Sequence, residues 1–302
     1  MSTLTDVGFI GLGNMGAAIA LRLIHTGARL HVYDPNPAAV ARLVEAGATA
    51  HDSPCSLADA TVLVFACLPS KAVCKDALFG QNGIAAGKAV RTYVEMSTIG
   101  PTAVASNAER LGERQIGLVD APVSGGPSAA REGTLAIMLS GAGETVAQAK
   151  PWLDRIAKTV HPLGELPGQA QAMKLVNNVL LAANMAAACE ALAMGIKAGL
   201  DADAMVRVIR SSTGHSAALD ILARFALTDS FDFGAHMSIL AKDVDLAMTE
   251  AAQLEIPAAV LAQAQGTWHA AMQEGRSQDD FTSILKSVEE RAKVRVRGAP
   301  QQ

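Results

Sequence analysis

Aromatic side chains are scarce in this 302-residue chain and make up 4% of it. Proteins that bind single-stranded nucleic acid stack bases on such side chains, so a stacking platform is not expected. The formal net charge is −4, which offers no basic surface to a phosphate backbone. The composition therefore predicts that the chain has no nucleic-acid partner.

Cysteine is also rare, with four residues in the whole chain: Cys55, Cys67, Cys74 and Cys189. No two of them form a CxxC pair, and none lies near a histidine at the spacing of metal ligands. The seven histidines are scattered along the sequence. We therefore expect reduced thiols and no metal site.

Long hydrophobic runs are missing as well. The first residues, MSTLTD, contain neither a basic region nor an apolar run, which predicts no signal peptide. The most apolar stretch, Val179–Cys189, is interrupted by Asn184 and is too short to span a bilayer. We expect a soluble, cytoplasmic protein with no membrane partner.

The two halves of the chain carry different patterns, and 50% of all residues are hydrophobic, which suits a globular protein. Short β-type runs alternate with helical patterns in the first half, as in the βαβ units of a mostly parallel sheet. The runs cover residues 7–10, 30–33, 61–66, 90–94, 117–120 and 135–139. The second half is helical, starting with one long pattern over 169–198 and continuing with 201–212, 215–227, 237–254, 258–274 and 279–293. We predict an α/β domain over 1–165 and an all-helical domain over 166–302, joined by the long helix.

A glycine-rich segment, Gly11-Leu12-Gly13-Asn14-Met15-Gly16, follows the first predicted strand and opens the first predicted helix. The first glycine of such a GxGxxG segment permits a tight turn, the second lets the backbone approach a pyrophosphate, and the third lets helix and strand pack closely. The helix also directs its N-terminal amides towards the phosphates. We expect all six residues to bind a dinucleotide in a Rossmann domain. The alternative is a purely structural turn.

Asp34 ends the second predicted strand, where a carboxylate can accept hydrogen bonds from the adenosine ribose. The same charge repels a 2′-phosphate, so Asp34 predicts NAD in preference to NADP. The alternative is that Asp34 only caps the turn before Pro35. Two further loops, with Leu68 and Pro69 in one and Thr98 in the other, follow later parallel strands, where ligands bind in open α/β sheets. We expect these three residues to contact the cofactor.

Three more segments carry polar groups suited to a substrate. Ser124-Gly125-Gly126 follows a strand, and a hydroxyl beside open amides can hold a carboxylate, although an ordinary turn has the same composition. Lys174 and Asn178 are four residues apart on the long helix and share a face. Burial lowers the pKa of a lysine, and an amine with a pKa of about 7–8 can exchange protons near neutral pH. A surface lysine is the alternative.

The whole chain resembles the β-hydroxyacid dehydrogenase family, which includes 3-hydroxyisobutyrate dehydrogenase, tartronate semialdehyde reductase and L-threonate dehydrogenase. The resemblance rests on four motifs in order: Gly11–Gly16, Asp120-Ala121-Pro122-Val123-Ser124-Gly125-Gly126, the stretch from Gly168 through Lys174 to Asn177-Asn178, and Lys242-Asp243. It implies a Rossmann domain followed by a helical domain. It also implies an NAD(P)-dependent oxidoreductase that interconverts a short β-hydroxyacid and its aldehyde or ketone.

The resemblance implies a role for each matching residue. Lys174 is the general acid/base, Ser124, Gly125 and Gly126 bind the substrate's acid group, and Asn178 orients the substrate. Lys242 lies over the nicotinamide end of the cofactor or over the substrate, unless it forms only a surface ion pair. Three other functions remain open: an imine reductase of the same fold, a non-catalytic dinucleotide-binding protein and a decarboxylating 6-phosphogluconate dehydrogenase. Lys174 argues against the first two. The length of this chain argues against the third, whose helical domain is usually considerably longer.

Substrate and assembly are less determined by the sequence. Nothing in it chooses among 3-hydroxyisobutyrate, glycerate, threonate and related hydroxyacids. The long apolar helix exceeds what a small domain can cover, which predicts a homodimer or homotetramer.

Overall fold

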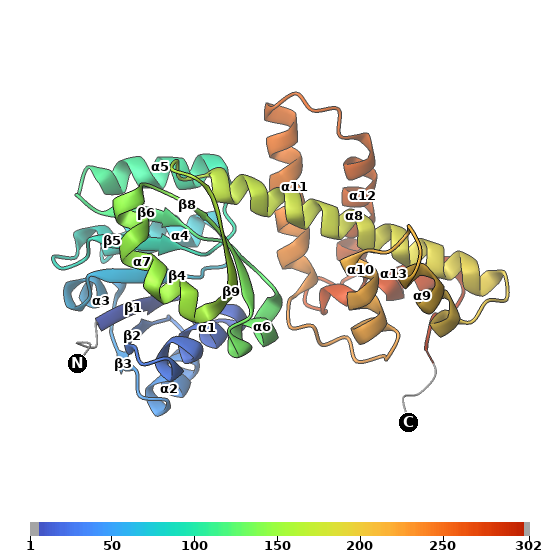
Figure 1. Ribbon diagram of the computed structural model, residues 1–302, viewed down its shortest axis with the longest axis horizontal. Helices are drawn as coiled ribbons and strands as arrows, with labels where there is room; N and C mark the ends of the chain where they lie inside the picture. Colours follow the sequence, from blue (N-terminus) through green and yellow to red (C-terminus); the bar gives the residue numbers. More distant parts are fainter. Residues whose placement is uncertain (1–5, 299–302) are drawn as a thin grey trace. The chain divides into compact units, whose positions relative to one another are not determined.

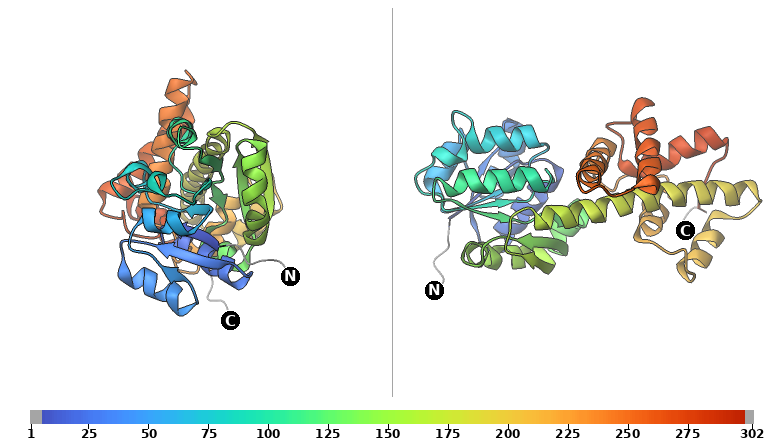
Figure 2. Two further views of the ribbon diagram at one scale, coloured as in Figure 1. Left: turned by 90° about the vertical axis from the view of Figure 1, so that its left-hand side faces the viewer. Right: turned by 90° about the horizontal axis from the view of Figure 1, so that it is seen from above.

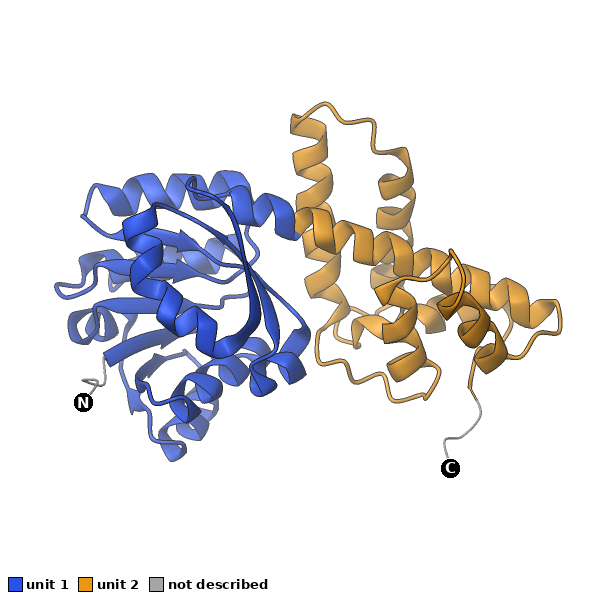
Figure 3. Ribbon diagram, in the orientation of Figure 1, with its two compact units in different colours: residues 1–174 blue, residues 175–302 orange. Residues whose placement is uncertain are grey.

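The computed structural model describes residues 6–298, and the chain divides into two compact units, residues 1–174 and 175–302 (Figure 3). The long helix α8 (Gln169–Lys197) begins in unit 1 and continues into unit 2. The sequence pattern placed the division at 165/166, before this helix. The compact units separate after its first turns, because those turns are hydrogen-bonded to the sheet of unit 1.

Unit 1 contains a sheet with helices on both of its faces (Figures 1 and 2). Its strands are β1 (Asp6–Ile10), β2 (Arg29–Tyr33), β3 (Thr49–Ala50), β4 (Leu63–Ala66), β5 (Thr92–Glu95), β6 (Gly117–Asp120), β7 (Val123–Ser124), β8 (Leu135–Ser140) and β9 (Ala157–Gly164). Its helices are α1 (Asn14–His25), α2 (Pro37–Glu45), α3 (Pro54–Ala60), α4 (Lys71–Phe79), η1 (Ile84–Ala86), α5 (Pro101–Gly112), α6 (Gly126–Glu132) and α7 (Gly143–Ile156).

The strand order is β3-β2-β1-β4-β5-β6-β8-β7, with β9 paired to β8. Strands β1 to β6 are parallel, as the alternation of patterns predicts, and their order is that of a Rossmann domain. Strand β8 is antiparallel to β6 and β7. Strand β9 was not expected from the sequence: it pairs only with β8, and Pro162 and exposed polar side chains hide its strand character.

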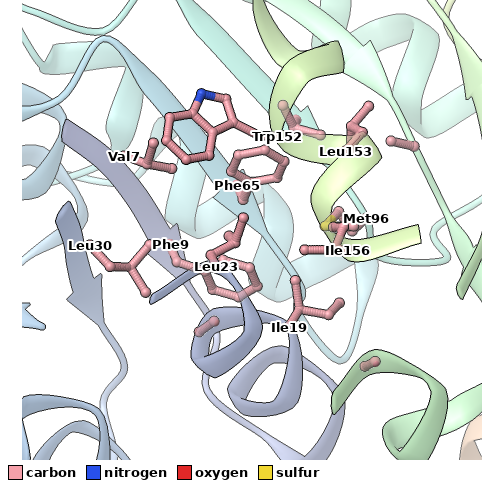
Figure 4. Close-up of a cluster of buried hydrophobic side chains, with 14 of the residues drawn as sticks. Val7, Phe9, Ile19, Leu23, Leu30, Phe65, Met96, Trp152, Leu153 and Ile156 are labelled. Atoms are coloured by element: carbon pink, nitrogen blue, oxygen red, sulfur yellow. The ribbon is translucent and has the colours of Figure 1, made fainter. Parts of the chain in front are cut away.

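The parallel strands are buried on both faces, which explains their continuous apolar runs. On one face Phe9 and Phe65 stack with their ring centroids 6.3 Å apart, and α1 and α7 cover them with Leu23 and Trp152 (Figure 4). The next residues along the same strands, such as Ile10, belong to a separate buried cluster on the opposite face, which includes residues of α3, α4 and α5. The sheet is therefore the middle layer of unit 1.

A buried carboxylate fixes the start of α8. The Asp120 side chain, at the end of β6, accepts hydrogen bonds from the backbone amides of Gly168 (2.8 Å) and Gln171 (3.1 Å). It also accepts from Ser140 Oγ (3.2 Å) and Gln171 Nε2 (3.0 Å). In turn, Gln171 Oε1 accepts from the amides of Ile99 and Gly100. Asp120 thus caps α8 from the sheet, where a negative charge also meets the positive end of the helix dipole.

The regular elements of unit 2 are helices within its described residues, apart from an isolated β-bridge between His236 and Asp280. Besides α8 it contains α9 (Ala202–Arg210), α10 (Ala217–Ile221), the π-helical turn η2 (Leu222–Ala226), α11 (Met237–Gln253), α12 (Ala259–Gln273), η3 (Phe281–Ser283) and α13 (Ile284–Ala292). The helices predicted over 215–227 and 279–293 are each divided into two segments. Trp268 of α12 is fully buried against α8, where its Nε1 donates to the carbonyl oxygen of Ala182 at 3.1 Å.

Helix α8 is long and apolar enough to cross a membrane by length and composition alone, with a mean hydropathy of 1.8 in its most apolar window. The apolar stretch Val179–Cys189 is only the middle part of this helix, so the helix is longer than that stretch predicts. One side of α8, including Leu175, Val179 and Met185, lies in the buried core of unit 2. A helix that contributes to the core of a soluble protein meets the same length and composition criterion.

We expect Asp120→Asn to lower the free energy of unfolding by about 1–3 kcal/mol. In one orientation the NH₂ of the new asparagine faces the backbone N–H groups of Gly168 and Gln171, and in the other it faces the side-chain NH₂ of Gln171. In both orientations a donor therefore meets a donor. Urea unfolding measures the change, and Asp154→Asn, which removes half of an exposed ion pair with Lys150, is the matched control. Equal midpoints for the two variants would contradict the capping role.

Candidate active site

The glycine-rich segment forms the tight turn between β1 and α1. Gly11 has a φ of +86°, and a Cβ there would lie 2.3 Å from the carbonyl oxygen of Cys67. A Cβ at Gly16 would lie 1.9 Å from the carbonyl oxygen of Gly11. These two glycines are therefore required by the fold itself, and they bring the loop after β4 directly against the glycine-rich loop.

Gly13 is different, because a Cβ at this position would meet nothing within 4 Å. It is the N-cap residue of α1 and has no side chain with which to cap the helix. The backbone of Gly13 is therefore open to a ligand at the positive end of a helix dipole, with Asn14 and Met15 in the first turn. This arrangement fits the pyrophosphate of a dinucleotide.

Asp34 follows β2 and lies beside this loop. Its Oδ2 accepts a hydrogen bond from the amide of Leu12 at 2.6 Å, and its Oδ1 accepts from the amide of Asn36 at 2.8 Å. Asp34 therefore does cap a turn, which was the alternative interpretation of its role. Each carboxylate oxygen can accept more than one hydrogen bond, so these contacts leave acceptor capacity for ribose hydroxyls.

The loops after β4 and β5 are linked to each other. The amide of Leu68, which precedes Pro69, donates to Ser97 Oγ at 2.8 Å, and Thr98 follows Ser97. Beneath them lies Glu95, whose Oε1 accepts from the Ser97 amide at 2.9 Å. Burial raises the pKa of Glu95 to about 7, against the opposing effect of hydrogen bonds from Ser97 and Tyr93.

The predicted carboxylate-binding segment spans β7 and the start of α6. Ser124 ends β7 and is only partly buried. Gly125 and Gly126 have φ values of +130° and +77°, a region that favours glycine. A Cβ at Gly125 would also meet Ala129 Cβ at 2.8 Å. The local conformation therefore accounts for both glycines without a ligand.

Lys174 lies beside this segment. Its side chain is 8% exposed, and its Nζ donates a hydrogen bond to the carbonyl oxygen of Val123 at 2.7 Å. Lys174 is one helical turn beyond Gln171, so the Asp120 cap that fixes the start of α8 also sets the position of this amine. Unit 1 therefore brings a buried amine to the residue that immediately precedes Ser124.

Asn178 and Lys242 meet in unit 2 through a residue that sequence reasoning did not select. Asp243 is 3% exposed and accepts from Asn178 Nδ2 at 2.6 Å and from Lys242 Nζ at 2.7 Å. Lys242 is thus ion-paired, as one interpretation expected, but its partner is a buried carboxylate and not a surface one. Asn178 is one turn beyond Lys174 on α8, as the spacing predicted.

Beyond the predicted residues and the predicted loop that contains Ser97, the structure adds four residues: Glu95, Asp120, Gln171 and Asp243. Their shared sequence signal is a polar side chain at the end of a buried strand or within an apolar helix, and Asp120 and Asp243 lie inside recognised motifs. Within residues 6–298, no group of three histidine, cysteine or acidic residues is placed to hold a metal ion.

Two family descriptions match the chain in succession. Residues 6–164 match the NAD-binding domain of 6-phosphogluconate dehydrogenase. Residues 168–288 match the NAD-binding domain of NADP-dependent 3-hydroxyisobutyrate dehydrogenase. Together they cover the sheet of unit 1 and most of the helical unit.

Characterised relatives match over nearly their full length. The chain is 33% identical to 2-(hydroxymethyl)glutarate dehydrogenase of Eubacterium barkeri, covering 97% of each chain. It is also 33% identical to 3-hydroxyisobutyrate dehydrogenase of Pseudomonas aeruginosa, covering 94% of this chain and 98% of the relative.

Solved structures agree with these matches. A 3-hydroxyisobutyrate dehydrogenase of Mycobacterium tuberculosis with L-serine has a TM-score of 0.85 at 27% identity, covering 95% of this chain and 99% of that one. An imine reductase of Streptomyces aurantiacus, at 22% identity and a TM-score of 0.64 over 94% of this chain and 99% of its own, shares the fold alone. With the glycine-rich loop, the buried Lys174 and matches along the whole chain, this protein belongs to the β-hydroxyacid dehydrogenase family.

Proposed function

We propose that the protein is an NAD-dependent dehydrogenase that interconverts a short β-hydroxyacid and its aldehyde or ketone, with Lys174 as the general acid/base. The observation that carries the proposal is the buried Lys174 amine, held 2.7 Å from the carbonyl oxygen of Val123 and next to Ser124. The family membership supports the reaction class, and the residues of this chain supply the roles.

In this proposal the substrate carboxylate accepts hydrogen bonds from the Ser124 hydroxyl and from the backbone amides of Gly125 and Gly126. Asn178 orients the substrate through its side-chain amide, which Asp243 holds in place. A dinucleotide, when bound, supplies the hydride acceptor for oxidation and the hydride donor for reduction. Gly11, Leu12, Gly13, Asn14, Met15 and Gly16 would hold its pyrophosphate, Asp34 its ribose, and Leu68, Pro69, Thr98 and Lys242 its nicotinamide end.

The proton passes to and from Lys174. During oxidation the O–H bond of the substrate breaks and its proton goes to the lone pair of Nζ, while the carbinol carbon loses a hydride and becomes a carbonyl. One N–H of the amine donates to Val123 O in the neutral and in the charged form, so the same carbonyl orients Nζ in both states. In reduction Lys174 returns the proton to the developing alkoxide.

A panel of substrates with matched variants tests the reaction. Purified protein should reduce NAD⁺ with a member of a panel of 3-hydroxyisobutyrate, D-glycerate, L-threonate and 4-hydroxybutyrate. A secondary amine serves as the imine-reductase control. We expect Lys174→Met and Lys174→Arg each to lower kcat by about 10²–10⁴-fold, because neither side chain exchanges a proton near neutral pH. Lys150→Met, at an exposed position, should leave kcat unchanged.

Kd values for NADH separate the possible failures. Nearly unchanged NADH binding in the Lys174 variants, together with lost turnover, supports the assigned role. Turnover of the amine alone would favour an imine reductase. NADH binding without turnover of any panel member would leave the dinucleotide site standing and favour either a substrate outside the panel or a non-catalytic protein.

Asp34 supports NAD as the cofactor, because its charge would face the 2′-phosphate of NADP. Asp34→Asn retains an acceptor for the Leu12 amide and removes the charge. We expect the ratio of kcat/KM for NADP⁺ to that for NAD⁺ to rise at least about tenfold. Glu45→Gln, an exposed change at the end of α2, is the control. A wild-type protein that already prefers NADP⁺ would refute the assignment.

We also propose a homodimer or homotetramer in the cytoplasm. Helix α8 carries exposed apolar side chains that recur three or four residues apart. The exposed fraction is 49% for Val176, 52% for Leu180 and, further along the helix, 71% for Met194. A helix face can pair with the same face of a second copy about a two-fold axis. One face of α8 is already packed in the core of unit 2. The other, exposed apolar face therefore favours a second copy of the chain as its partner.

Light scattering after size-exclusion chromatography tests the assembly. We expect wild-type protein to elute with the mass of a dimer or tetramer, and Val176→Glu with Leu180→Glu to lower that mass, because charges would be buried in the contact. Val44→Glu, at an exposed position of α2, should elute as the wild type does. An oligomer unaffected by the α8 changes would place the contact elsewhere.

A further inference from the structure

A buried acid lies beneath the two loops that the proposed function assigns to the cofactor. Glu95 is fully buried at the end of β5. Its Oε2 accepts a hydrogen bond from Tyr93 Oη at 3.0 Å, and its Oε1 accepts from the Ser97 amide at 2.9 Å. The proposed proton transfer and substrate contacts do not use Glu95.

The contacts continue from Glu95 to the glycine-rich loop. Ser97 Oγ accepts from the Leu68 amide at 2.8 Å, so Ser97 joins the loop after β5 to the loop after β4. The neighbouring Cys67 carbonyl lies against Gly11, where a Cβ would approach it to 2.3 Å. One carboxylate thus supports a series of contacts that reaches the dinucleotide turn.

We propose that Glu95 is a positioning residue of the cofactor site, whose charged carboxylate holds the loops beginning at Cys67 and Ser97 in the arrangement that binds the dinucleotide. This inference rests on the proposed function. Hydrogen bonds to a charged acceptor are roughly twice as strong as neutral ones, so a proton on Glu95 weakens its contacts with Tyr93 and Ser97. Cofactor affinity should then fall as the carboxyl becomes neutral.

Four other titratable groups surround Glu95. They are Tyr93 on the same strand, Asp120 on β6, Cys74 on α4 and Cys67 after β4. Burial raises the pKa of Glu95 to about 7. Burial also raises the pKa values of Tyr93 and Cys74 above their ordinary values, which keeps both neutral. Burial also raises the pKa of Asp120 above that of an ordinary aspartate, which is lower than that of a glutamate.

Protein stability and cofactor binding should depend on pH in opposite directions. The folded protein binds the Glu95 proton more tightly than the unfolded chain, whose glutamate has a pKa near 4.5. The contribution of Glu95 to the unfolding free energy therefore decreases as pH rises from about 4.5 to about 7 and is level above that range. Dinucleotide binding should strengthen over the upper part of the same range. A merely structural role predicts no such gain in binding.

The experiment measures the Kd for NADH by fluorescence between pH 6 and 8.5 in wild-type protein, Glu95→Gln and Glu132→Gln. NADH is used because it lacks a 2′-phosphate, which would itself titrate. In the wild type we expect Kd to rise about three- to tenfold from pH 8.5 to pH 6. Glu95→Gln should show a flat profile near the low-pH value. The control Glu132→Gln, on α6, should follow the wild type.

A second variant covers the case in which Glu95→Gln does not fold, which thermal unfolding would reveal. Ser97→Ala retains the carboxylate and the amide that donates to it, and removes the hydroxyl that accepts from Leu68, so its Kd should be raised and its dependence on pH reduced. A Glu95→Gln or Ser97→Ala profile that follows the wild type would overturn the inference and leave the proposed function intact. Failure of wild-type protein to bind NADH at any pH would instead overturn the proposed function.

Discussion

The buried carboxylate of Asp120 is the interaction on which the arrangement of the site depends. It begins the segment that ends with Ser124, Gly125 and Gly126, and it caps the helix that carries Lys174. Two backbone amides and the side chains of Ser140 and Gln171 replace the water that burial removes. One side chain therefore sets both the end of the sheet and the start of α8, which is why the Lys174 amine reaches the carbonyl of Val123.

Local signals in the sequence predicted most of the fold. Apolar runs buried on both faces indicated the parallel strands, and long 3.6-residue patterns indicated the helices of unit 2. The glycine-rich turn could be predicted because one of its glycines is required by a contact within a single strand–turn–helix unit: a Cβ at Gly16 would strike the carbonyl of Gly11. The proximity of Lys174 to Ser124 came from the family resemblance, since no local pattern relates two residues so far apart.

The features that sequence reasoning missed depend on contacts between distant residues. Asp120 and Gly168 are 48 positions apart, and Asn178 and Asp243 are 65 apart, so neither pair produces a periodic or spacing signal. Strand β9 lacks the apolar alternation of a strand because only β8 pairs with it. The first turns of α8 share the composition of the rest of the helix, and their contacts with unit 1, such as the hydrogen bonds to Asp120, distinguish them from it.

Two buried acids, Glu95 and Asp120, lie side by side at the carboxyl ends of the adjacent parallel strands β5 and β6. Burial raises the pKa of each, and their charges oppose one another, so ionising both makes the folded state less stable. Apolar or amide side chains would avoid that electrostatic cost, although the loop amides would then lose charged acceptors. The acids are best explained by what they hold: Glu95 supports the loops after β4 and β5, and Asp120 supports the helix with the amine. The strand interiors determine the fold, whereas these strand ends carry an electrostatic cost and hold in place the loops and the helix that follow them.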